Sequence, residues 1–282
     1  EMLLEGKLVA QALDEATARQ CGELQEKGIK PCLAILRIGE RADDLSYERG
    51  ALKRCQKVGI EPRVYALPQD TGEKQLLELV ESLNRDETVH GVLMLRPFPA
   101  HIRDEAVRAA LDPAKDVDGI TDGSLAGVFA GTGRGFAPCT AEACIRILEH
   151  YHIDPAGRRA AVVGRSLVVG RPAAMLLLHK NATVTLCHTK TQNLPQVCRQ
   201  AEILVVAAGK MGAVGAECAA PGQIVLDVGI HMGEDGKLRG DTDFAAMEPV
   251  VEAITPVPGG VGAVTTSVLA EHVARAAARQ CQ

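Results

Sequence analysis

The segment VVGRSLVVGRP, from Val162 to Pro172, joins a short apolar run to a glycine-containing turn and a helix start. Gly164 ends the apolar run, and Gly170 stands two residues before Pro172, a residue type favoured in the first turn of a helix. A helix N-terminus offers free backbone N–H groups and partial positive charge to an anion, and glycine lets a phosphate approach the backbone. The segment therefore predicts a nucleotide site, although its spacing is not the usual G-x-G-x-x-G and leaves an ordinary strand–turn–helix open.

Strand and helix patterns alternate on both sides of this segment. In the second half, strands are predicted at RRAAVVG, ATVTLCH, AEILVVAAG and QIVLDVG, and helices at RPAAMLLLHK and NLPQVCRQ. In the first half, helices are predicted over about residues 8–27, over 44–58 and from Thr71, and strands over 31–38, at PRVYAL and over 89–99. Asp43 or Asp44 is expected to cap the helix at 44–58. This order predicts an α/β protein with parallel sheets.

A Gly- and Asp-rich connection over about residues 112–139 is the expected junction between two domains. The last helix, predicted over 264–278, is expected to pack back on the first domain. We therefore predict an N-terminal α/β domain over 1–121 plus 265–282, and a Rossmann-like dinucleotide-binding domain over 138–256.

The composition argues against several classes of protein. Of the 282 residues, 46% are apolar and only 2% are aromatic, which suits parallel sheets covered by helices. A net charge of −5 without a basic run, and so few aromatic rings, argue against a nucleic-acid partner. No apolar stretch reaches membrane-spanning length, and the start lacks a signal-peptide pattern. Nine scattered cysteines without a C-x-x-C pair indicate reduced thiols, a cytoplasmic protein and no metal site.

The choice of nucleotide depends on the strand that follows the glycine turn. In a common dinucleotide fold, an acid at the end of this strand binds the ribose 2′-hydroxyl. Here the strand ends in His188, Thr189 and Lys190, with no acid. Together with Arg165, this end suits a 2′-phosphate and favours NADP over NAD, the alternative being a solvated turn.

Two carboxylates stand close together in PAKDVDGI, at Asp116 and Asp118. They are suited to acid–base chemistry, to a metal or to an amidine-like ring edge. Capping aspartates in a loop are the alternative, and this pair alone does not decide between them.

Several motifs occur here in one order: KDVDG, GRSLVVGRP, TVTLCHTKT, VVAAGK, GDTDF and TPVPGGVG. The combination resembles the bifunctional methylenetetrahydrofolate dehydrogenase/cyclohydrolase family over nearly the whole chain. The resemblance implies a two-domain α/β protein, usually a homodimer, with folate in a cleft between the domains and NADP on the second domain. That family oxidises 5,10-methylenetetrahydrofolate by hydride transfer and hydrolyses the methenyl product to 10-formyltetrahydrofolate.

The resemblance also implies roles for individual residues. Tyr47 and Asp118 are the expected catalytic and substrate-binding pair, Tyr47 stacking on the aminobenzoyl group and Asp118 hydrogen-bonding the pterin. The turn that lines the folate cleft is expected at Pro258, Gly259 and Gly260. The residues expected to contact NADP are Gly164, Arg165, Ser166, Thr189 and, through its backbone, Ile230.

The chain departs from the family pattern where protons are handled. Ala51 occupies the position of the usual lysine, four residues after Tyr47, and Leu95 occupies that of the usual glutamine. Loss of a general acid–base group typically costs about 10²–10⁴-fold in rate, so we predict that the cyclohydrolase step is lost or weak. Hydride transfer depends mainly on positioning and is expected to survive.

Two other functions remain open on the sequence. One is a non-catalytic paralogue that binds folate or nucleotide, which the loss of both groups favours. The other is a dehydrogenase for another one-carbon or small imine substrate. Arg96, beside Leu95, is expected to bind the folate glutamate tail, to pair with Asp43 or Asp44, or to be an exposed arginine at a strand end.

Overall fold

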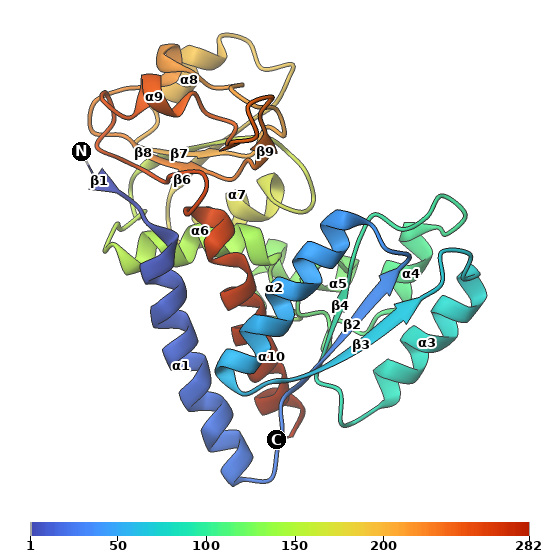
Figure 1. Cartoon of the computed structure of the whole chain (residues 1–282). Helices are drawn as coiled ribbons and strands as arrows, with labels where there is room; N and C mark the ends of the chain where they lie inside the picture. The colour runs from blue at the N-terminus through green and yellow to red at the C-terminus, as the bar shows by residue number, and fades with distance from the viewer. Residues whose placement is uncertain (1, 282) are drawn as a thin grey trace. The chain divides into compact units, whose positions relative to one another are not determined.

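The computed structural model describes residues 2–281, which divide into two compact units (Figure 1). We call residues 12–139 and 266–281 the small-sheet unit, and residues 2–11 and 140–265 the large-sheet unit, and we describe each by itself. The division falls within helix α1 (Gly6–Glu26) and at the first residues of α6 (Cys139–His150) and α10 (Thr265–Gln280).

The small-sheet unit contains a three-stranded parallel sheet in the order β3-β2-β4. Its strands are β2 (Cys32–Ile38), β3 (Glu61–Leu67) and β4 (Gly91–Met94). Besides α10 and most of α1, its helices are α2 (Ala42–Val58), α3 (Glu73–Arg85), α4 (Asp104–Ala110) and α5 (Asp122–Ala130).

Every residue of β2 is buried, as expected for the central strand of a parallel sheet covered on both faces. On one face, alternate β2 side chains pack with Leu76 and Val80 of α3 and Val107 of α4. On the other, a Cβ on Gly91 would lie 2.7 Å from a methyl carbon of Val117 and 3.3 Å from one of Val273, so only glycine lets α10 approach β4 this closely.

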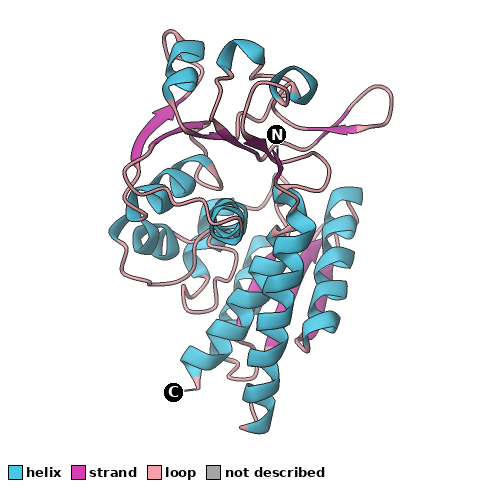
Figure 2. Ribbon diagram, turned by 90° about the vertical axis from the view of Figure 1, so that its left-hand side faces the viewer, coloured by secondary structure: helices cyan, strands magenta, loops and turns pink. Residues whose placement is uncertain are grey.

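The large-sheet unit contains a six-stranded parallel sheet in the order β1-β11-β8-β7-β5-β6. These strands are β1 (Met2–Leu3), β5 (Arg159–Val163), β6 (Thr183–Cys187), β7 (Ile203–Val206), β8 (Ile224–Asp227) and β11 (Ala253–Ile254). Helices α7 (Gly170–His179) and α8 (Leu194–Gln200) lie on opposite faces of this sheet, which Figure 2 shows between helical layers. Besides α6, the remaining elements are α9 (Phe244–Met247), an antiparallel hairpin of β9 (His231–Met232) and β10 (Leu238–Arg239), and two 3₁₀ turns, Ala216–Cys218 and Val261–Ala263.

The strand order of the large sheet reverses at β5. From β5 the chain passes through α7 to β6 on one side, and then through α8 to β7 on the other. In open α/β sheets, ligands bind outside the carboxyl ends of the strands at such a switch point. The ends of β5 and β7 are joined here by a 2.7 Å hydrogen bond from Ala207 N to the Val163 carbonyl.

The predicted α/β fold with a Rossmann-like second domain is confirmed, but some local predictions are wrong. Neither Asp43 nor Asp44 caps α2, because the helix already begins at Ala42 and Arg41 is the N-cap residue. The third helix does not begin at Thr71 but at Glu73, after Gly72. Residues 2 and 3, predicted in the first domain, pair as β1 with β11 of the large sheet, an edge strand too short to leave a sequence pattern.

Candidate functional site

A cavity of about 660 Å³ opens at the switch point of the large sheet, beyond the ends of β5 and β7. All the predicted nucleotide contacts line this one cavity: Gly164, Arg165, Ser166, Thr189 and Ile230. Lys210 and His188 line it too, whereas Asp241 is the sole carboxylate among its lining residues. The wall is therefore mainly apolar with several cationic or dipolar groups, which suits a phosphorylated ligand.

The glycines of the turn after β5 have no room for a side chain. Gly164 has a φ of 118°, and a Cβ there would lie 1.9 Å from the carbonyl oxygen of Ala207. A Cβ on Gly170 would lie 2.0 Å from the carbonyl oxygen of Gly164. The hydroxyl of Ser166 accepts a 3.1 Å hydrogen bond from Val169 N, at the start of α7. The turn thus brings bare backbone and a helix N-terminus to the cavity, as phosphate binding requires.

The same cavity also holds a pair of side chains, His231 and Asp241, that were not among the residues predicted from the sequence. His231 donates from Nε2 to Oδ1 of the buried Asp241 over 2.6 Å, and both residues line the cavity. The other Asp241 oxygen accepts from Gly209 N at 3.0 Å. The GDTDF motif contains Asp241, but its partner lies ten residues earlier in the β9–β10 hairpin, which no periodicity predicted.

A second, smaller cavity of about 290 Å³ lies in the large-sheet unit. Pro258, Gly259 and Gly260, the predicted folate turn, all line it. Gly259 has a φ of 99°, which favours glycine, and its carbonyl accepts from Gly6 N at 2.8 Å. Ile230 lines both cavities and is 56% exposed, so it stands between the predicted nucleotide and substrate residues of this unit.

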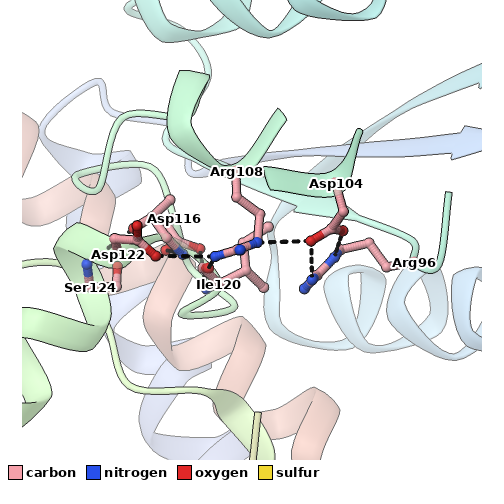
Figure 3. A network of polar contacts seen from close by, with 8 residues as sticks. Arg96, Asp104, Arg108, Asp116, Ile120, Asp122 and Ser124 are labelled. Carbon is pink, nitrogen blue, oxygen red and sulfur yellow. Dashed lines mark hydrogen bonds and ion pairs between the residues drawn. The ribbon is translucent and has the colours of Figure 1, made fainter. Parts of the chain in front are cut away.

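In the small-sheet unit, the two aspartates of the KDVDG turn have different surroundings. Asp116 is fully buried, and its two oxygens accept from Ile120 N at 3.0 Å and Thr121 N at 2.8 Å. Figure 3 shows this carboxylate against the start of α5. Lys115, also buried, donates to the carbonyl of Leu83 at 2.7 Å. Asp116 is therefore a structural capping residue, which is the alternative to a chemical role that the sequence left open for Asp116 and Asp118.

Asp118 is half-buried and is electrostatically coupled to Tyr47. Burial, and then the charge of Asp116, raise the pKa of Asp118 to about 6, although a hydrogen bond from the Cys139 thiol opposes the shift. Burial, followed by the negative charge of Asp118, raises the pKa of Tyr47 well above its ordinary value. The structure thus brings together a tyrosine that stays protonated and a carboxylate whose protonation changes near neutral pH.

The two positions that depart from the family pattern are buried and apolar. Ala51 is 1% exposed and Leu95 is 6% exposed. Glu48 lies three residues before Ala51 on the same face of α2, but it is paired with Arg37 over 2.7 Å. Neither position supplies a group that titrates.

Arg96 forms a two-pronged ion pair with Asp104, with distances of 2.5 and 2.8 Å (Figure 3). Asp104 also accepts from Arg108 at 2.8 Å, and Arg108 reaches Asp122 at 3.1 Å. Burial opposes the shift, but these hydrogen bonds from Arg96 and Arg108 lower the pKa of Asp104. The predicted pairing of Arg96 with Asp43 or Asp44 is therefore wrong, since its partner comes from α4.

The described residues contain neither a cluster of metal ligands nor a helix able to span a membrane. Within residues 2–281, no group of three or more His, Cys, Asp or Glu side chains is arranged to hold a metal ion. Over the same range, no helix combines the length and apolarity needed to cross a membrane.

Both units resemble known proteins. Residues 4–118 match the family model described as tetrahydrofolate dehydrogenase/cyclohydrolase, catalytic domain, and residues 138–281 match the NAD(P)-binding domain of the same family. The bifunctional protein FolD of Carboxydothermus hydrogenoformans is 47% identical over 275 residues, covering 97% of this chain and 96% of that protein.

Solved structures agree with this result. The bifunctional FolD dehydrogenase/cyclohydrolase of Campylobacter jejuni has a TM-score of 0.96 to this chain, with 37% identity over 99% of each chain. The FolD enzyme of Trypanosoma brucei, solved with NADP cofactor and an inhibitor, has a TM-score of 0.93, with 30% identity over 100% of this chain and 99% of that one. The matched regions, the sequence identity and the shared fold together establish that this chain belongs to the tetrahydrofolate dehydrogenase/cyclohydrolase family.

Proposed function

We propose that this protein oxidises 5,10-methylenetetrahydrofolate to 5,10-methenyltetrahydrofolate with NADP, and that its cyclohydrolase step is lost or weak. The observation that carries the proposal is the contrast between the intact nucleotide cavity of the large sheet and the two buried apolar side chains, Ala51 and Leu95, in the other unit.

NADP is supported by the chemistry of the cavity. The turn at Gly164 leaves backbone exposed where a Cβ would clash with Ala207, so a phosphate can approach it. Arg165 and Lys210 line the cavity, and no acid follows β6 to bind a ribose 2′-hydroxyl. The T. brucei relative was solved with NADP. Bound NADP would supply the hydride acceptor, and Ile230, which lines the cavity, would contact it through its backbone.

Folate binding is assigned to Tyr47 and Asp118, with Pro258, Gly259 and Gly260. The aromatic face of Tyr47 stacks on the aminobenzoyl group, and the ionised Asp118 accepts hydrogen bonds from the donor-rich edge of the pterin. Because the Tyr47 hydroxyl stays protonated, it adds no negative charge beside Asp118.

The two reactions make different demands on these residues. Hydride transfer requires the methylene carbon to be held against the nicotinamide, which is mainly a matter of orientation. Hydrolysis of the methenyl group requires a base or a water-orienting group. Alanine and leucine supply neither, and Glu48 on the same helix face is neutralised by Arg37.

The test is an assay with 5,10-methylenetetrahydrofolate and NADP that follows NADPH and the methenyl product together. We expect NADPH to form and the methenyl product to accumulate, disappearing no faster than its spontaneous hydrolysis. Cyclohydrolase turnover as fast as the dehydrogenase step would contradict the proposed loss.

A non-catalytic folate- or nucleotide-binding paralogue is the second candidate, because Ala51 and Leu95 both lack proton-handling groups. Calorimetric titration with a folate, alongside the assay, separates the two. Folate binding without NADPH formation would favour the paralogue. A homodimer and a cytoplasmic location are further proposals, and sedimentation equilibrium of the purified protein tests the first.

A further inference from the structure

We propose that His272 is a positioning residue for Asp118: it holds the Val117 carbonyl, and so leaves the Cys139 thiol free to orient the Asp118 carboxylate. The proposal rests on the proposed function, in which Asp118 binds the folate. It adds a group from the last helix that neither the sequence motifs nor the family match assigns.

The contact between His272 and the turn is short and buried. His272, on α10, has no exposed surface, and its Nδ1 lies 2.7 Å from the carbonyl oxygen of Val117. Because a carbonyl oxygen only accepts, Nδ1 must carry the hydrogen. The Val117 carbonyl belongs to the peptide group that leads into Asp118, so this bond fixes the backbone from which the carboxylate projects.

The Cys139 thiol has two acceptors and one hydrogen. Its Sγ lies 3.4 Å from the Val117 carbonyl, and it also hydrogen-bonds the Asp118 carboxylate. The much shorter bond from His272 satisfies the Val117 carbonyl, and a carboxylate is the stronger acceptor. The thiol therefore donates to Asp118, while its Sγ stays 3.8 Å from His272 Nδ1.

The imidazole ring has little freedom to leave this position. Its centroid lies 4.9 Å from that of the buried Phe136 ring. The guanidinium groups of Arg275 and Arg279 lie 5.3 and 4.9 Å from the centre of the Phe136 ring. The imidazole ring of His272 is thus packed in one orientation, with its Nδ1–H directed at the Val117 carbonyl.

The other polar side chains of the turn are engaged inside the protein. Lys115 donates to two carbonyl groups, and Asp116 accepts from two backbone N–H groups. Without His272, the Val117 carbonyl would be left with the weak thiol donor, and the thiol would be drawn from Asp118. An unsatisfied buried acceptor is costly, so the turn is expected to shift.

Five charged or titratable groups interact with Asp118. They are Asp116 in the same turn, Tyr47 on α2, Arg96 after β4, Cys139 at the start of α6 and His272 on α10. His272, Arg96 and the thiol favour the ionised carboxylate, whereas Asp116 opposes it. Removing His272 draws the Cys139 thiol away from Asp118, and the loss of that hydrogen bond raises the pKa of Asp118 above its value of about 6.

The experiment compares His272→Leu, which removes the donor, with His272→Asn, whose amide N–H can take the place of Nδ1–H. In His272→Leu we expect KM for methylenetetrahydrofolate to rise about tenfold or more, KM for NADP to be unchanged, and the acid limb of the kcat/KM profile to move to higher pH. In His272→Asn we expect a folate KM within about threefold of wild type.

Val268→Ala is the matched control, since Val268 is fully buried on the same helix and its side chain has no hydrogen-bond donor. It should lower the melting temperature without moving the acid limb. If His272→Leu does not fold, His272→Gln replaces it. The amide donor of glutamine lies one carbon farther out than that of asparagine, so His272→Gln should raise the folate KM whereas His272→Asn should not.

If His272→Leu, or His272→Gln in its place, keeps the wild-type folate KM and the acid limb of the pH profile does not move, the inference is overturned. The proposed function would remain intact. Wild-type protein that binds no folate in a calorimetric titration overturns the proposed function, and the inference with it. Equal losses in the Leu and Asn variants would show that His272 acts by packing, and would also overturn it.

Discussion

At the scale of single residues, the environment separates groups that look alike in the sequence. Asp116 and Asp118 stand two residues apart, but the first is fully buried and doubly hydrogen-bonded by backbone N–H groups, whereas the second is half-buried and accepts from a thiol. One carboxylate builds the turn and the other remains available to a ligand.

The first prediction concerns the missing proton-handling groups. The double variant Ala51→Lys and Leu95→Gln should raise methenyltetrahydrofolate hydrolysis by about 10²-fold or more, the usual contribution of a general acid–base group. The rate is read from the loss of methenyl absorbance. Ala51→Leu with Leu95→Met, of similar bulk without polar groups, is the control. An unchanged rate in the Lys–Gln variant, with folding intact, would show that hydrolysis is limited elsewhere.

The second prediction concerns the pH dependence of stability. Burial and Asp116 raise the pKa of Asp118 to about 6, above its ordinary value of 3.8. The folded state then binds more protons than the unfolded state between those values, so Asp118 lowers stability progressively as pH rises from about 4 to 6. Asp118→Asn should therefore raise the melting temperature at pH 7.5 and have no such effect near pH 3.5. A variant less stable than wild type at pH 7.5 would contradict this.

At the scale of elements, the glycines on either side of β5, Gly157 and Gly164, differ in what an added side chain would meet. Gly164 has both a positive φ and a backbone oxygen where its Cβ would be. Gly157 also has a positive φ, of 75°, but nothing lies within 4 Å of its Cβ position. An alanine at Gly157 would therefore suffer backbone strain alone, whereas one at Gly164 would suffer strain and a clash with the Ala207 carbonyl.

The third prediction uses this pair. Gly157→Ala should cost about 1 kcal/mol of unfolding free energy from strain and leave NADP affinity unchanged. Gly164→Ala should also weaken NADP binding by tenfold or more. The added Cβ forces the turn away from Ala207, so the backbone N–H groups of the turn no longer point toward the bound phosphate. Urea unfolding and fluorescence titration with NADPH measure the two effects. Equal NADP affinities in both variants would show that the turn is not the phosphate site.

At the scale of the whole molecule, the chain contributes to the large-sheet unit from two distant segments. Residues 2–11 supply β1, which pairs with β11, and Leu4 beside it is fully buried. The edge strand β1 therefore forms only when the first residues of the chain pair with residues some 250 positions away in the sequence.

The fourth prediction follows from that pairing. Leu4→Ala should lower the free energy of unfolding by about 2–5 kcal/mol, as for other buried leucines, although Leu4 lies beside a strand of only two residues. Urea unfolding measures the loss, and Leu8→Ala, at an exposed position on α1, is the control and should be near neutral. A loss below about 0.5 kcal/mol for Leu4→Ala, within the range of surface substitutions, would contradict the assignment of this segment to the sheet.

The α/β class, the parallel sheets and the position of the glycine turn were determined by the sequence itself, because apolar periodicity and glycine conformation are local properties of the chain. The resemblance over nearly the whole length likewise required only the order of the motifs, and the family match agrees with it. Tertiary structure decided the rest. Arg96 pairs with a residue 8 positions away in the sequence, His231 with one 10 positions away and His272 with one 155 positions away. Strand β1 is separated from its partner β11 by still more. Such contacts depend on how distant elements pack, and no local pattern encodes which side chains then meet.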